Sequence, residues 1–540
     1  MTEPLLNVDQ IQGNILAGFN KDFQTFLFLE ILDVAGAKAW LANVAPEVAT
    51  LAEVLAFNRL FKQMRARRGA ETPGLSATWF NLAFSYDGVA KLTSSDEADS
   101  FLDGPFCGRL DGAATALGDP TTGPGAPSNW VVGGPQNRAD LVVIVAGDSA
   151  TDVAAYVERL AASTWVMPDG ATGSPSMRLL YRQVAGTLPG ALAGHEHFGF
   201  KDGISQPGVR GLVDEADFLT DRTIDPACQS DEKKPELAKP GQPLIWPGQF
   251  VIGADYPSQD NNDPRKAGAA VAVVPDWTQD GSYLVVRRLA QDTAGFWNWM
   301  RDRAKEMLDT GRFAGITPIR LAATLVGRWP SGTPISRSPV VDNPALAADD
   351  FAPNNFLFDG PGTSCPVNGS PDTFPPAVDD SAGRRCPMAA HIRKVNPRDM
   401  GTEQGGANDT LTRRFLRRGL PYGQASNTPV AQSLGMTFPV EGDSAERGLM
   451  FLSYQASIDT QFQFISTTWA NSTNKPIDGG IDPVIGQPAA GGPPSTIRLI
   501  DDAGAPYDLP TPPDFVVPTG GGYFFAPSIK AITERLAKPD

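Results

Sequence analysis

The sequence predicts an α+β protein with two similar halves. Apolar runs of strand length, rich in β-branched and aromatic residues, occur in both halves. In each half, one of these runs is followed by apolar residues at helical spacing. Glycine and proline are frequent, at 55 and 48 of 540 residues, so many loops and turns are expected.

The N-terminal half contains three predicted strands, at 25–32, 141–146 and 177–184. Ser149 and Asp152 form a capping pair after the second strand and predict that a helix follows it. The apolar residues at helical spacing in this helix are Val153, Tyr156, Val157 and Leu160.

The C-terminal half contains predicted strands at 282–289, 449–453 and 523–526. A helix is predicted at 291–308, and its apolar face is expected to carry Trp297, Met300, Ala304 and Leu308. Segments of about 340–388 and 484–518 are crowded with Pro, Gly, Asp and Ser. Loops of this length are uncommon unless they are functional or disordered.

A proline-rich segment, 226–247, marks the predicted domain boundary. It contains five prolines and the charge run 231–234. We therefore interpret 226–247 as a linker between an N-terminal domain, 1–225, and a C-terminal domain, 248–540.

The chain is acidic, with 45 Lys and Arg against 61 Asp and Glu and a net charge of −16. This charge argues against nucleic acids and anionic membranes as partners. The apolar runs are shorter than the ~18 residues that suggest a membrane span. The start lacks a basic segment followed by an apolar one, so no classical secretory signal is expected. A cytoplasmic location is favoured, or an extracellular one if the chain is processed.

Cysteine and histidine are both scarce. Four cysteines are too few for a disulfide scaffold, so disulfides are not expected to hold this fold. Because there are three histidines, any imidazole chemistry must use His195, His197 or His391.

The segment 195–209 reads HEHFGFKDGISQPGV and places Asp202 in a GxxDG motif. Its glycines, Gly199 and Gly203, allow the backbone to approach a flat ligand closely. GxxDG alone more often marks a turn, and the chain contains a second copy at 108–112. The copy at Asp202 differs in having aromatic residues on both sides of Gly199 and the run ISQPG behind it.

Two further segments carry candidate functional residues. The segment 386–398 reads CPMAAHIRKVNPR and holds His391, although a lone histidine is usually structural. The segment 413–423 reads RRFLRRGLPYG and has four arginines in its first six positions. These arginines form either a solvated basic face or a site for an anion such as a carboxylate or propionate.

Together and in this order, the three segments resemble the dye-decolourising peroxidase family of haem enzymes. The resemblance extends nearly end to end, and the length and loop insertions are most similar to the larger fungal-type and bacterial members. The other similar blocks are NVDQIQGNILAGF, WFNLAFSYDGVAKL, GSYLVVRRLAQD, LVGRWPSGTP and GLMFLSYQASIDTQFQFISTTWAN.

The resemblance implies two ferredoxin-like domains whose antiparallel sheets pack together, as in a dimeric α+β barrel, with haem b in the C-terminal domain. It implies that His391 is the proximal iron ligand, Asp202 the distal acid–base and Arg417 the distal arginine. Arg417 is chosen over Arg418 because the family arginine stands five residues before the aromatic of the Pro-Tyr-Gly turn. Arg398 would pair with a haem propionate.

Further haem contacts are implied at the GxxDG segment and on the strand at 449–453. They are Gly199, Phe200, Gly203, Ile204, Leu449 and Phe451. Strand alternation puts Leu449 and Phe451 on one side, as walls of the distal pocket or as ordinary core.

Three other side chains have implied roles. Asp459 would accept a hydrogen bond from the outer nitrogen of His391, or else cap the helix that follows it. Tyr422 and Trp469 match aromatic positions that pass electrons from bulky substrates at the surface.

The implied function is reduction of hydrogen peroxide with oxidation of dyes, phenols and other aromatic donors, by a monomer or a homodimer. A carboxylate can move a proton between the two peroxide oxygens, and a guanidinium stabilises the charge that develops as the O–O bond breaks. An acidic optimum suits an Asp base, whose ordinary pKa is ~3.9.

Three alternatives remain open. A non-haem iron or copper oxidoreductase would use His195, His197 and His391 with Glu196. A thiolate-ligated haem would use Cys365 or Cys386, each of which precedes a proline. In a non-catalytic haem carrier, Asp202 and Arg417 would be structural.

Overall fold

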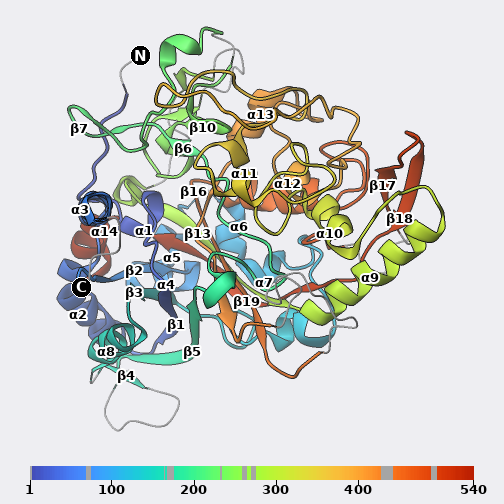
Figure 1. The fold of residues 1–540 in the computed structure, drawn as a ribbon. Helices are drawn as coiled ribbons and strands as arrows, with labels where there is room; N and C mark the ends of the chain where they lie inside the picture. Colours follow the sequence, from blue (N-terminus) through green and yellow to red (C-terminus); the bar gives the residue numbers. More distant parts are fainter. Residues whose placement is uncertain are drawn as a thin grey trace.

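The fold was analysed in a computed structural model, which confirms the α+β class (Figure 1). The structure describes residues 3–68, 74–101, 103–162, 164–166, 175–231, 234–257, 264–268, 275–426, 442–487 and 495–539.

One large sheet joins the two halves of the chain. Within the described residues its order is β14-β16-β13-β19-β2-β3-β1-β5-β4, and β15 also pairs with β16. In that order the strands span Leu416–Arg417, Arg447–Gln455, Ser282–Gln291, Val516–Ala526, Thr78–Phe84, Leu141–Gly147, Phe23–Ile31, Met177–Gly186 and Trp165–Val166, and β15 spans Leu420–Gly423. The antiparallel strands of the two halves meet at β19 and β2, where Phe525 pairs with Phe84.

All six predicted strands are confirmed, as β1, β3, β5, β13, β16 and β19. Every residue of β3 is buried, which agrees with its uninterrupted apolar sequence. Two apolar clusters pack against the sheet; Leu27, Leu29 and Val143 belong to one, and Phe26 and Phe28 to the other. Alternate side chains of β1 therefore enter different cores.

Helices α2, α3 and α8 lie to the left of the sheet in Figure 1, and α9 to α13 lie on the other side. The helices α1 to α14 span Gly13–Leu16, Val34–Val44, Leu51–Arg68, Tyr86–Leu92, Ser95–Ala98, Gly104–Gly108, Leu110–Ala113, Ala150–Ala161, Thr293–Asp309, Pro318–Val326, Pro344–Ala348, His391–Lys394, Ala407–Thr412 and Ile529–Ala531. Two π-helical segments follow late in the chain, η9 at Ile458–Ala470 and η10 at Ile532–Leu536.

The two predicted helices are confirmed as α8 and α9. The Ser149 side chain caps α8 by accepting from the Asp152 amide. On α9 the predicted face is correct for Trp297, Met300 and Ala304 but wrong for Leu308, which is 50% exposed. Met307 completes the buried face, because it lies three residues after Ala304.

The segment predicted as a linker is folded. Its strands β9 (Leu237–Lys239) and β10 (Gln242–Ile245) form a small sheet with β6 (Gly208–Val209). The domain division at 226–247 stays a prediction. The other short pairs are β7 with β8 (Leu212–Asp214, Asp217–Phe218), β11 with β12 (Tyr256–Pro257, Ala267–Gly268) and β17 with β18 (Thr496–Ile500, Pro506–Pro510).

The last of these hairpins lies inside the segment 484–518 that we expected to be irregular. The other expected loop, about 340–388, contains only the short helix α11 and a turn of 3-10 helix among its described residues. It is held by side chains, since Arg337 donates to the carbonyls of Ala352 and Pro375 and pairs with Asp372.

A disulfide joins Cys228 to Cys365 across 137 residues of sequence. The expectation that disulfides do not hold this fold is therefore wrong at this point. A low cysteine count excludes a disulfide scaffold but says nothing about a single pair whose members meet only in the folded chain. The bond ties the turn beside β9 to the loop 340–388.

Replacing Cys228 by Ser should lower the free energy of unfolding by about 2–4 kcal/mol, because the open chain gains entropy when a long loop is released. Urea unfolding measures the change. The matched control is Cys107→Ser, since Cys107 is a free thiol. Equal midpoints for Cys228→Ser and the unchanged protein would contradict a stabilising disulfide.

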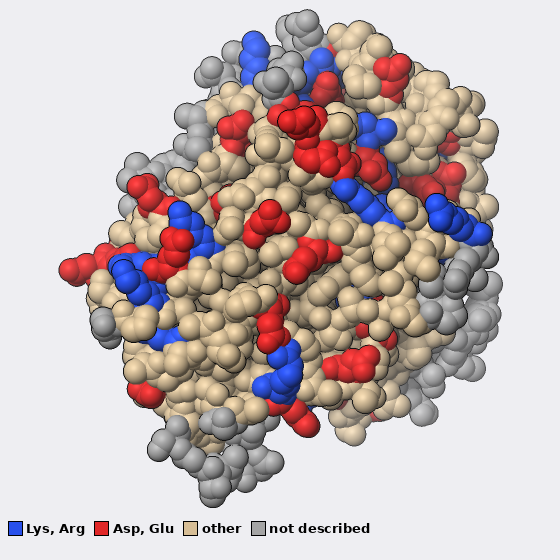
Figure 2. All heavy atoms as spheres, turned by 90° about the vertical axis from the view of Figure 1, so that its left-hand side faces the viewer, with Lys and Arg blue, Asp and Glu red and all other residues tan. Residues whose placement is uncertain are grey.

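Acidic and basic side chains are interspersed on the face seen in Figure 2, with basic groups lying singly or in small clusters among acidic ones. Within the described residues, no helix is long and apolar enough to cross a membrane.

Candidate haem site

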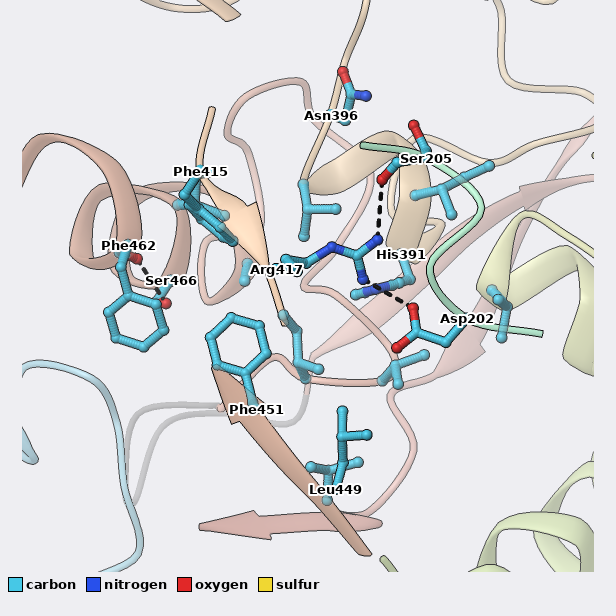
Figure 3. A pocket seen from close by; sticks show the side chains of 18 of the residues that line it. Asp202, Ser205, His391, Asn396, Phe415, Arg417, Leu449, Phe451, Phe462 and Ser466 are labelled. Carbon is cyan, nitrogen blue, oxygen red and sulfur yellow. Dashed lines mark hydrogen bonds and ion pairs between the residues drawn. The ribbon is translucent and has the colours of Figure 1, made fainter. Parts of the chain in front are cut away.

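A cavity of about 350 Å³ lies between the sheet and the α9–α13 side of the molecule. The turn 198–207, strands β13 and β16, and helices α12 and η9 contribute to its wall. It brings together the three motif residues Asp202, His391 and Arg417, which come from distant parts of the sequence (Figure 3).

Asp202 and Arg417 form an ion pair in this cavity, with Arg417 Nη1 2.9 Å from Asp202 Oδ1. Arg417 Nη2 also donates to the Ser205 carbonyl. Gln206 fixes the backbone of Arg417, because its amide group accepts from the Arg417 N–H and donates to the Arg417 carbonyl. The turn 198–207 and strand β14 are thus joined by hydrogen bonds as well as by the ion pair.

The pair keeps Asp202 ionised. Burial opposes ionisation of the carboxyl, but the Arg417 charge and the Gly203 amide, 2.6 Å from Oδ1, outweigh burial and lower the Asp202 pKa. The Asp202 side chain is 36% exposed and faces the cavity, so its carboxylate is available to a ligand. Gly203 has a φ of +74°, a conformation that favours glycine.

Arg418 points away from the cavity. Its guanidinium donates to the backbone carbonyls of Asn14, Ile15 and Leu16, at the end of α1. The arginine beside Asp202 is therefore Arg417, the one chosen by motif counting.

His391 lies at the start of α12 and lines the cavity. Its Nδ1 is 2.8 Å from Oδ2 of Asp482, so the ring donates there and turns Nε2 away from that carboxylate. Burial alone would lower the His391 pKa, but Asp482 outweighs burial and raises it. The imidazole is therefore oriented and made more basic.

The prediction that Asp459 would hold His391 is wrong. Asp459 is exposed in the first turn of η9, and the helix is capped by Ser457 and by Asp103, which accepts from the Ile458 amide. Asp482 takes the role instead, since its Oδ1 is held by the Val484 and Ile485 amides and its Oδ2 is left for His391.

Three arginines, Arg328, Arg398 and Arg414, line one part of the cavity, and no described carboxylate forms an ion pair with any of them. Burial lowers their pKa values, to about 10 for Arg328 and Arg414. Arg414 Nε is buried without a hydrogen-bond partner among the described residues. Such a cluster fits a group with more than one negative charge, as the propionates of haem provide.

Loop 340–388 positions two of these arginines. Arg398 donates to the Asn354 and Phe356 carbonyls and stacks on the Phe356 ring at 3.6 Å. Arg328 donates to Pro353 and Asn354. The irregular loop 340–388 therefore holds two cavity-lining arginines in place.

The remaining walls are mostly apolar, as a flat macrocycle requires. Leu449 and Phe451 face the cavity from β16, as strand alternation predicted, and Phe200, Gly203 and Ile204 line it from the turn. Gly199 does not line this cavity, and its expected haem contact stays a prediction. With a φ of +94° it reverses the chain before Asp202.

The predicted surface roles of Tyr422 and Trp469 are wrong, because both residues are buried, at 2% and 0% exposed. The Arg288 guanidinium stacks on the Tyr422 ring, and Trp469 Nε1 donates to Glu403. An aromatic motif position alone does not indicate exposure.

The three histidines do not come together as the non-haem metal site of the first alternative. His195 Nδ1 contacts its own loop at Ala193, and His197 is buried with Nε2 2.8 Å from the Tyr422 carbonyl. Burial lowers the His197 pKa to about 4. No group of three His, Cys, Asp or Glu in the described parts of the chain could hold a metal ion, which argues against the non-haem alternative.

The thiolate alternative is also contradicted. Cys365 is bonded to Cys228, and Cys386 is fully buried, with its pKa raised to about 12 by burial. Neither residue lines the cavity.

Comparisons with known proteins agree with this architecture. Residues 10–169 match the family model described as the DyP dimeric alpha+beta barrel domain. The chain is 32% identical to dye-decolorizing peroxidase msp1 of Mycetinis scorodonius, over 98% of this chain and 88% of the relative.

Two solved structures extend the likeness to the whole fold. An ancestral D-type dye decolorizing peroxidase is 31% identical with a TM-score of 0.74. A dye-decolorizing peroxidase in complex with 2,6-dimethoxyphenol is 27% identical with a TM-score of 0.70. Each alignment covers 99% of this chain and 100% of the other.

The chain belongs to the dye-decolorizing peroxidase family of haem peroxidases. This membership makes it a peroxidase and argues against a non-catalytic haem carrier.

Proposed function

We propose that the cavity binds haem b, with His391 as axial ligand, and that the protein reduces hydrogen peroxide while oxidising phenols and dyes. The observation that carries the proposal is one cavity in which the Asp202–Arg417 pair lies beside a histidine oriented by a buried carboxylate. The complex of a relative with 2,6-dimethoxyphenol supports a phenolic donor.

Haem, when bound, supplies the iron that activates peroxide. His391 would hold it through Nε2, because Nδ1 is occupied by Asp482. Arg328, Arg398 and Arg414 would pair with the propionates. Leu449 and Phe451 would pack against the macrocycle and exclude water from it.

Asp202 would move the proton on the distal side. Its ionised carboxylate accepts a proton from one peroxide oxygen and returns it to the other, which lets water leave. Arg417 directs its guanidinium at the same place and stabilises the negative charge that develops. Because Arg417 lowers the Asp202 pKa, this base stays ionised in mild acid.

A visible absorption spectrum before and after a stoichiometric amount of hydrogen peroxide tests the proposal. The purified protein, supplied with haem, should show the intense violet band of haem, and the band should change within the mixing time. His391→Ala should lose the band, and the matched variant His195→Ala should keep it. Absence of the band in the unchanged protein would overturn the proposal.

A further inference from the structure

A second carboxyl group, that of Glu196, lines the same cavity as Asp202. The two residues stand six positions apart on one turn. Both oxygens of Glu196 accept backbone amides of that turn, from Phe198 and Phe200, each at 2.9 Å. Glu196 therefore braces the turn that carries Asp202.

Gln291 of β13 can form a hydrogen bond with Glu196 whether the carboxyl group is ionised or protonated. Its Nε2 is 2.6 Å from Glu196 Oε2, while its Oε1 is buried without a hydrogen-bond partner among the described residues. A half-turn of the amide exchanges its nitrogen and oxygen. The amide then donates to an ionised Glu196 or accepts from a protonated one, and 2.6 Å suits an O–H···O bond.

The charged residues of the same turn that line the cavity with Glu196 are Lys201 and Asp202. Asp202 is the charged neighbour that acts on it, and it faces Arg417. Farther along β13, Arg287 is neutralised by Asp119 at 2.7 Å. Behind the turn, α9 contributes aromatic rings, with Phe296 4.3 Å from the Phe198 ring.

These surroundings keep a proton on Glu196 in acid. Burial raises its pKa to about 7, and the Asp202 charge adds to the effect although the amides oppose it. Below that pH the cavity holds one carboxylate opposite Arg417. Above it, Glu196 releases its proton to solvent, and the cavity gains a second carboxylate that acts on Asp202.

We propose that Glu196 is a positioning residue that sets the alkaline limit of the peroxide reaction. Protonated, it holds the turn and leaves Asp202 as the single anion beside Arg417. Ionised, it adds a second negative charge, which weakens binding of an anion such as hydroperoxide or cyanide on the distal side. This inference rests on the proposed function.

The test compares the haem-loaded protein with its Glu196→Gln variant, because Gln is a neutral match for the protonated acid. The rate of reaction with peroxide should fall about tenfold below its plateau by about pH 8 in the unchanged protein and stay level in the variant. The ratio of their cyanide affinities should change in parallel, from about one below about pH 6 to about ten at about pH 8. The ratio cancels the pH dependence that arises from the ionisation of cyanide itself.

Two further variants keep the test decisive if Glu196→Gln folds poorly. Gln291→Leu removes a donor to the ionised carboxylate, so the alkaline fall should move to higher pH. Glu53→Gln is the matched control, since Glu53 also accepts a backbone amide, that of Thr50, but lies outside the cavity. Its profile should equal that of the unchanged protein.

Three results would overturn the role of Glu196 and leave the proposed function intact. The alkaline fall in rate persists in Glu196→Gln, it does not move in Gln291→Leu, or it is absent from the unchanged protein. Failure of the unchanged protein to bind haem or react with peroxide overturns the proposed function instead.

Discussion

Replacing Asp202 by Asn should slow the reaction with hydrogen peroxide by about 10²–10⁴-fold and leave the haem band in place. The amide keeps the shape of the carboxyl group but cannot accept the proton that must move between the peroxide oxygens. Stopped-flow measurement of the haem band after mixing with peroxide gives the rate. In the unchanged protein the rate should fall only below the usual Asp range, because the Asp202 pKa is lowered.

The second GxxDG copy supplies the control, since Asp111→Asn makes the same change in the same motif. Asp111 also pairs with an arginine, Arg138, at 2.6 Å, but it does not line the cavity. Its variant should react with peroxide at the unchanged rate. Equal rates for Asp202→Asn and Asp111→Asn would exclude Asp202 as the distal base.

The sequence was sufficient to place in one site the residues that short local motifs mark. Asp202 stands in a short glycine turn whose flanking residues carry the family resemblance, and Arg417 was chosen by its fixed distance from a Pro-Tyr-Gly turn. Asp482 gave no such signal, because it lies 91 residues from His391 and meets it only in the folded chain. Arg328 was missed for the same reason, whereas Arg414 belongs to the arginine cluster 413–418 that we expected to face either solvent or an anion.

The fold shows the same division between local and long-range information. The apolar strand runs were predicted, but β2, which joins the two halves at Phe84, was not. Its place between β19 and β3 is a tertiary pairing rather than a property of its own sequence. Pairing of Cys228 with Cys365 and burial of Trp469 are likewise decided by distant parts of the chain.

We expect haem binding to depend on Asp482, because this carboxylate orients the His391 ring. Replacing Asp482 by Asn should weaken haem affinity by about 10–100-fold, because a neutral amide no longer fixes the His391 tautomer or makes its ring more basic. Titration of the haem-free protein with haem, followed at the violet band, measures the affinity. The stability of the variant should also be measured by urea unfolding, because Asp482 Oδ1 accepts hydrogen bonds from the Val484 and Ile485 amides.

Asp459→Asn separates this role from a general effect of removing a carboxylate near η9. Asp459 is exposed and makes no contact with His391, whose Nδ1 partner is Asp482, so haem affinity should be unchanged. A loss in Asp482→Asn without a matching loss of stability would show that the carboxylate acts on the ligand rather than on the fold. Equal losses of haem affinity in the two variants would show that removal of a negative charge is sufficient. They would contradict a specific role of Asp482 in haem binding.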